Sequence, residues 1–89
     1  MIRLNYNIKE IQWKPKALRQ IRKIKDQKTK NVIYDAVSSL RDFPNCSNIK
    51  KLKDRQGYRL RVGRWRVFFT DSLTILCIEE VKKRNDRTY

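Results

Sequence analysis

The pattern of apolar and polar residues predicts helices in the first half of the chain and strands in the second, after one short opening strand. Apolar side chains two positions apart, at Leu4, Tyr6 and Ile8, predict that opening strand within residues 4–12. Pro15 suits the first turn of a helix, because that turn leaves its N–H groups unbonded. The apolar residues that follow gather on one helical face: Ala17, Leu18, Ile21 and Ile24. We therefore expect a first helix over residues 15–25.

A second helix is predicted after Asp26, which can cap its first turn. Its apolar residues recur at i, i+1, i+4, i+5 and i+8: Val32, Ile33, Ala36, Val37 and Leu40. Pro44 should end this helix. The short link between the two helices predicts an antiparallel pair, each burying one stripe against another part of the molecule.

The second half of the chain changes to the two-residue period of strands. Apolar residues alternate with polar ones over residues 58–62 and again over 65–69, which predicts two strands. With Gly63-Arg64 as a two-residue turn, Val62 pairs with Trp65 and Arg61 with Arg66. Leu60 then pairs with Val67, and Arg59 with Phe68. Leu73 to Ile78 predicts a further strand after a turn at residues 70–72.

This register separates the two faces of the predicted sheet. One face is apolar and should pack on the helices: Tyr58, Leu60, Val62, Trp65, Val67 and Phe69. The other displays Arg59, Arg61 and Arg66 together, with Phe68. We expect an α+β fold of one domain, residues 1–89, with two N-terminal helices on one face of a mainly antiparallel sheet.

Charge narrows the possible partners. The chain has 23 Lys and Arg against 9 Asp and Glu, a formal net charge of +14. This excess favours a polyanionic partner. No apolar run approaches the length of a membrane span, and no signal peptide is evident at the start, so we expect no membrane and a cytoplasmic protein.

Candidate chemistry is limited by the residue types present. Cys46 and Cys77 form no Cys-x-x-Cys pair and the chain has no His, so we expect reduced thiols, no metal and no cofactor. Any acid–base chemistry must use Lys, Arg, Tyr or carboxylates. Guanidinium groups bind phosphate oxygens through paired hydrogen bonds. Three of them held together on one sheet face therefore indicate a phosphate site, although alternating Arg residues on a sheet are commonly only solvated.

The sequence resembles the RelE toxins of bacterial toxin–antitoxin pairs, within the RelE/ParE superfamily, over nearly its whole length. Residues 17–24 resemble the first helix of that family, and Lys51-Leu52-Lys53 with residues 57–68 resemble its central strands. Residues 83–89 resemble its C-terminal pattern of a basic residue, Arg and Tyr. The resemblance implies a RelE-like fold and a ribosome-dependent endoribonuclease that cleaves mRNA in the ribosomal A site. It also implies a cognate antitoxin as partner, besides the ribosome and mRNA.

The resemblance also implies roles for individual residues. Arg59, Arg61 and Arg66 would hold the scissile phosphate, Tyr89 would accept the 2′-hydroxyl proton, and Arg84 would stabilise or help protonate the leaving oxygen. Further RNA contacts are expected at the neighbouring basic residues: Lys51, Lys53, Lys82, Lys83 and Arg87.

Two alternatives remain at this point. A ParE-like protein would share the fold and inhibit DNA gyrase without cutting anything, and a non-enzymatic RNA-binding module would use exposed aromatic residues, of which this face offers only Phe68. Glu79 and Glu80 are the nearest carboxylates in sequence. On a regular strand they face opposite ways, and we expect either to serve in salt bridges.

Overall fold

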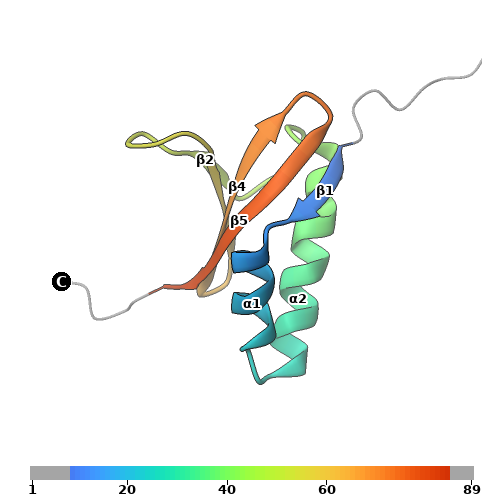
Figure 1. Cartoon of the computed structure of the whole chain (residues 1–89), viewed down its shortest axis with the longest axis vertical. Coiled ribbons are helices and arrows are strands. Elements are labelled where there is room, and N and C mark those ends of the chain that lie inside the picture. The colour runs from blue at the N-terminus through green and yellow to red at the C-terminus, as the bar shows by residue number, and fades with distance from the viewer. Residues whose placement is uncertain (1–8, 85–89) are drawn as a thin grey trace, which may run out of the picture.

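The protein is described by a computed structural model in which residues 9–84 are placed. The chain runs through β1 (Glu10–Trp13), α1 (Pro15–Arg22), α2 (Gln27–Ser38), a short 3-10 helix (Ser39–Asp42), β2 (Ile49–Lys51), β3 (Tyr58–Val62), β4 (Trp65–Ser72) and β5 (Ile75–Lys83). The strands form one sheet in the order β1-β5-β4-β3-β2 (Figure 1). Leu4, Tyr6 and Ile8, predicted in the first strand, lie outside the described residues.

The sheet is mixed, which refines the expectation of a mainly antiparallel sheet. The pairs β2–β3, β3–β4 and β4–β5 are antiparallel, whereas β1 runs parallel to β5. A parallel pair needs a long crossover. Here the crossover contains both helices and the three other strands, so the first and last described strands are neighbours.

A single core joins the helices to alternate residues of the strands. The buried residues of this core are Ala17, Ile21, Ile24, Ile33, Val37, Leu40, Phe43, Leu60, Val67, Phe69, Leu76, Ile78 and Val81. We call the strand positions that join it the inner face, and the alternate positions the outer face. Trp65 belongs to the inner face as predicted, but it lies at the margin of the core and is only partly buried.

Both helices are shorter than predicted, and the buried apolar stripe of α2 is narrower. Helix α1 ends at Arg22 rather than residue 25, because the N–H of Ile24 bonds the carbonyl of Ile21 and tightens the last turn. Val32 is 50% exposed instead of buried. It lies a full 100° around the helix from Ile33, whereas Ile33, Val37 and Leu40 follow the i, i+4, i+7 line that faces the core. Helix α2 ends at Ser38, before the 3-10 helix and Pro44.

The last hairpin turns later than predicted. Residues 70–72 belong to β4, and the turn is formed by Leu73 and Thr74, since Ser72 pairs with Ile75. Leu73 is 89% exposed and has a positive φ of 40°. Side-chain contacts support the end of β4 in addition to the backbone ladder. Thr70 donates a hydrogen bond to Glu79 at 2.9 Å, and Asp71 forms an ion pair with Lys9 at 3.0 Å.

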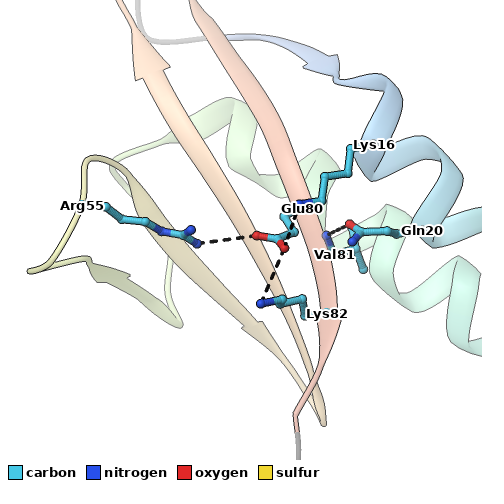
Figure 2. Close-up of polar contacts among 6 residues, drawn as sticks. All are labelled: Lys16, Gln20, Arg55, Glu80, Val81 and Lys82. Atoms are coloured by element: carbon cyan, nitrogen blue, oxygen red, sulfur yellow. Dashed lines mark hydrogen bonds and ion pairs between the residues drawn. The ribbon is translucent and has the colours of Figure 1, made fainter.

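Helix α1 protects the edge of β5 beyond the point where β1 ends. Strand β1 pairs with β5 only as far as Ile78, where Lys14 N–H bonds the Ile78 carbonyl. Beyond that point Gln20 accepts a hydrogen bond from the N–H of Val81 at 2.6 Å (Figure 2). The side chain thus replaces a strand partner on an edge that could otherwise pair with another chain. Within residues 9–84, no helix is long and apolar enough to span a membrane.

Two glycines give a matched test of backbone geometry. Gly57 has a φ of +112°, and a Cβ there would lie 2.8 Å from the carbonyl oxygen of Phe69. Gly63 has a φ of +58°, with open space around the same position. We expect Gly63→Ala to cost about 1 kcal/mol through its positive φ alone, and Gly57→Ala to cost about 3 kcal/mol because the neighbouring strand must also shift. Urea unfolding of both variants measures the difference, and equal losses would contradict it.

Candidate functional site

The register of the central hairpin agrees with the sequence prediction at every pair. Val62 pairs with Trp65, Arg61 with Arg66, Leu60 with Val67, and Arg59 with Phe68. Gly63 adopts the positive φ that the two-residue turn requires. The alternation along both strands therefore brings Arg59, Arg61 and Arg66 to the outer face.

Two rows of side chains cross the outer face. Arg61, Arg66 and Lys82 form one row across β3, β4 and β5. The adjacent row consists of Lys50, Arg59, Phe68 and Glu80, across β2 to β5. Arg84 follows the end of β5, where its N–H bonds the carbonyl of Arg64 at 2.6 Å. We refer to Arg59, Arg61, Arg66 and Arg84 as the guanidinium cluster.

Arg66 lies at the electrostatic centre of the guanidinium cluster. Its partial burial, followed by the positive charges of Arg59, Arg84 and Arg61, lowers the pKa of its guanidinium from the usual value. Its Nε is buried and has no hydrogen-bond partner among the described residues. Nor does any carboxylate in the described part of the chain form an ion pair with Arg59, Arg61 or Arg66.

Such an arrangement is suited to a bound phosphate. Like charges held on neighbouring strands destabilise the sheet locally, and a buried donor without a partner adds to that cost. An anion with several oxygens would accept the unused N–H groups and offset the repulsion. Beside the cluster, Lys50, Arg59 and Arg61 line a hollow of about 280 Å³ with Asn48 and Ile49. The outer face therefore has both the charge and the space for one phosphate group and its sugar.

The other candidate residues are distributed over both faces. Lys82 is on the outer face, in the row of Arg66. Lys51 pairs with Tyr58 and Lys83 with Trp65, so both belong to the inner-facing positions, and Lys53 is exposed in the loop between β2 and β3. Arg87 and Tyr89 lie outside the described residues.

Lys50 is the basic residue that the sequence reasoning missed. It pairs with Arg59 on the outer face. Predicting it required the register between β2 and β3, and the loop between these strands has no two-residue turn to set that register.

The prediction that Glu79 and Glu80 face opposite ways is wrong. The β4–β5 ladder shifts register between Phe68 and Phe69, where a bulge inserts Glu79 as an extra residue. Glu80 pairs with Phe68 on the outer face, and Glu79 accepts the hydrogen bond from Thr70 on the same face. A β-bulge has no signal in a two-residue pattern of this length, so the sequence alone could not reveal it.

Glu80 is the centre of an ion-pair network, as expected for one of these carboxylates. It lies 3.3 Å from Lys16, 3.6 Å from Lys82 and 3.7 Å from Arg55 (Figure 2). Burial raises the pKa of the Glu80 carboxyl group, but the hydrogen bond from Lys16 and the charges of Lys82 and Arg55 outweigh burial and hold the pKa below its usual range. Glu80 is therefore a charged anchor between α1, β5 and the β2–β3 loop.

This network predicts a pH dependence of stability. Because the folded pKa of Glu80 lies below its unfolded value of about 4.3, the contribution is present above that pH and is lost as pH falls through the folded pKa. We expect Glu80→Gln to flatten the fall of the melting temperature between pH 5 and pH 3. Glu10→Gln, at an exposed carboxyl group on β1, is the control. Equal acid profiles for Glu80→Gln and the unaltered protein would contradict this prediction.

Comparisons with known proteins agree on one group. The sequence model of the family described as "ParE toxin of type II toxin-antitoxin system, parDE" matches residues 11–87. No curated protein sequence matches the chain significantly.

Solved structures share the fold at low identity. The RelE–RelB complex of Pyrococcus horikoshii OT3 matches with a TM-score of 0.75 and 16% identity, covering 91% of this chain and 99% of the other. The RelBE2 toxin–antitoxin complex of Mycobacterium tuberculosis matches with a TM-score of 0.74 and 20% identity, covering 86% and 99%. The YoeB dimer of Staphylococcus aureus matches with a TM-score of 0.70 and 19% identity, covering 86% and 98%.

Proposed function

The chain belongs to the ParE toxin family of type II toxin–antitoxin systems, within the RelE/ParE superfamily, and from that premise we propose that it is a ribosome-dependent endoribonuclease that cleaves mRNA in the ribosomal A site. The observation that carries this proposal is the guanidinium cluster. Arg66 is surrounded by three like charges and lacks a carboxylate partner in the described part of the chain. A bound phosphodiester supplies the missing anion.

The chemistry needs three contributions. The attacking 2′-hydroxyl must lose its proton, the pentacovalent phosphate must be stabilised, and the leaving 5′-oxygen must gain a proton. Arg59, Arg61 and Arg66 supply the second contribution. By resemblance to the RelE toxins, Tyr89 takes the 2′-proton and Arg84 serves the leaving oxygen. A tyrosine base requires the phenolate form, which positive charges close to the hydroxyl group favour.

Dependence on the ribosome follows from the weakness of this acid–base set. The chain has no His, and Glu80 is held by three cations. The enzyme therefore relies on a surface that bends the mRNA into line, since orientation can supply several kcal/mol of barrier reduction. Lys50, Lys53 and Lys82 add positive charge for rRNA or mRNA, and we extend the same role to Lys51, Lys83 and Arg87.

A cognate antitoxin completes the proposal. The structures with which the fold is shared include RelE–RelB complexes. We propose that the antitoxin of this chain places acidic residues over the guanidinium cluster and so excludes RNA.

The second candidate is inhibition of DNA gyrase. The observation in its favour is that the matching family model is the one for ParE toxins. Gyrase inhibition by binding alone gives no reason for Arg59, Arg61 and Arg84 to place their positive charges close to Arg66, so we favour RNA cleavage.

One experiment separates these functions. The chain is induced in growing bacteria, and mRNA 5′ ends, protein synthesis and DNA integrity are followed together over the first minutes. We expect protein synthesis to stop first, with new 5′ ends inside codons of translated messages. Double-strand DNA breaks with intact messages would overturn the proposal in favour of gyrase inhibition.

A further inference from the structure

Phe68 is the only aromatic side chain on the outer face of the sheet among the described residues. We propose that Phe68 is a stacking platform for one nucleobase of the RNA strand whose phosphate binds the guanidinium cluster, and that Arg55 covers this platform until RNA displaces it. This inference rests on the proposed function. It adds a base-binding subsite to a site so far described only by its phosphate contacts.

The position of Phe68 matches the spacing within a nucleotide strand. Its cross-strand partner is Arg59, and Arg66 lies two residues earlier on β4. Side chains two apart on one strand face are about 7 Å from each other. A phosphate held by Arg59 and Arg66 therefore has the ring of Phe68 within reach of the base on the same or the adjacent nucleotide.

Arg55 occupies the place that a base would take. Its guanidinium lies over the Phe68 ring, 4.6 Å from the centroid. A planar cation on an aromatic face and a planar base on that face use the same surface. The ring is therefore already arranged for face-on contact with a flat group.

The cover is weakly held. Arg55 is in the β2–β3 loop, its side chain is 51% exposed, and its ion pair with Glu80 is long, at 3.7 Å. Exposed pairs of this kind contribute little to stability. Glu80 keeps Lys16 and Lys82 as partners when Arg55 leaves. Arg55 is then free to accompany the RNA backbone.

The hollow beside the ring has groups that can contact the edge of a base. Its volume is about 270 Å³, and Gln56, Thr70, Glu79 and Glu80 line it with Phe68. This is smaller than the roughly 300–1,000 Å³ of whole-ligand pockets, which suits a single ring system. The bulge turns the Glu79 carboxylate into this hollow, and a carboxylate accepts hydrogen bonds only. The subsite therefore favours bases with amino donors on their edge, guanine above all, over uracil.

Binding of short RNA tests the platform without requiring cleavage. The probe is a fluorescein-labelled hexanucleotide with a 2′-deoxy linkage at its centre, compared with the same strand abasic at one central position. We expect the unaltered full-length protein to bind the strand with guanine at that position about 10-fold more tightly than the abasic strand, as for other base–aromatic stacks. Phe68→Leu should lose this preference, and Phe68→Trp should keep it.

Removal of the cover gives an independent second measurement. Arg55→Ala should strengthen the preference for the guanine strand over the abasic strand, because in this variant no guanidinium has to leave the Phe68 ring before a base can stack on it. Lys53→Ala is the matched control, since it removes one charge from the same loop and should weaken both strands equally. Circular dichroism confirms that each variant is folded.

The inference is overturned if the unaltered protein binds both strands alike, including the case of no measurable binding to either, or if Phe68→Leu keeps the preference. These outcomes differ from failure of the proposed function. If the protein shows the base preference but cleaves no codons in cells, the proposed endoribonuclease activity is wrong and the stacking role of Phe68 stands. If it cleaves codons but shows no base preference, the stacking role is wrong and the proposed activity stands.

Discussion

Arg66→Ala should lower the rate of ribosome-dependent mRNA cleavage about 1,000-fold, because a preorganised donor to the transition-state phosphate contributes two to three orders of magnitude. Arg66 is at the centre of the guanidinium cluster, and its side chain feels the charges of the other three members. Because Arg66 is repelled by three like charges, its interaction with the extra negative charge of the pentacovalent phosphate should be the strongest in the cluster, and the substitution removes that interaction.

The same substitution should leave the fold intact. No carboxylate among the described residues pairs with Arg66, and its neighbours repel it, so the melting temperature should stay the same or rise slightly. Arg22→Ala removes an equal charge from the exposed side of α1 and should change neither property. Cleavage is measured in a purified translation system and the melting temperature by thermal unfolding, for both variants. A melted Arg66→Ala variant, or equal loss of cleavage in both variants, would show that the cluster does not act as the phosphate site.

Tyr89→Phe should reduce cleavage about 100-fold while ribosome binding is retained, as expected for removal of a general base. Phenylalanine keeps the ring and removes only the hydroxyl group, so binding by the aromatic surface persists. If the phenol is the base, the cleavage rate of the unaltered protein should also rise with pH until the hydroxyl is ionised. The measurement is a single-turnover rate on stalled ribosomes across pH 6 to 9.

The control for Tyr89→Phe is Tyr34→Phe, at a partly exposed tyrosine that contacts Trp13 on the helical side of the molecule. It should cleave at the unaltered rate. Full activity and an unchanged pH profile in Tyr89→Phe would move the base elsewhere, and Lys53 or Lys83 would be tested next.

The sequence alone was sufficient to predict the structure where one local rule decides the geometry. A two-residue turn at Gly63-Arg64 sets every pair of the β3–β4 hairpin, and the shared face of Arg59, Arg61 and Arg66 follows from it. It was insufficient where packing between distant segments decides. The exposure of Val32 depends on which line of α2 meets the sheet, and the shared face of Glu79 and Glu80 depends on a bulge. Phe68 was predicted on the correct face, but Arg55 as its cover depends on the path of a loop.

The parallel pairing of β1 with β5 has a consequence for synthesis. During translation β1 emerges early, but its only strand neighbour in the sheet is β5, which emerges after all other described elements. The outer-face row that ends in Lys82 is therefore incomplete until β5 is made. Native contacts between such distant segments slow folding, since a long loop must close before any of them forms. Under the proposed function, we therefore expect RNA cleavage to begin only after β5 has left the ribosome and the parallel pair has closed.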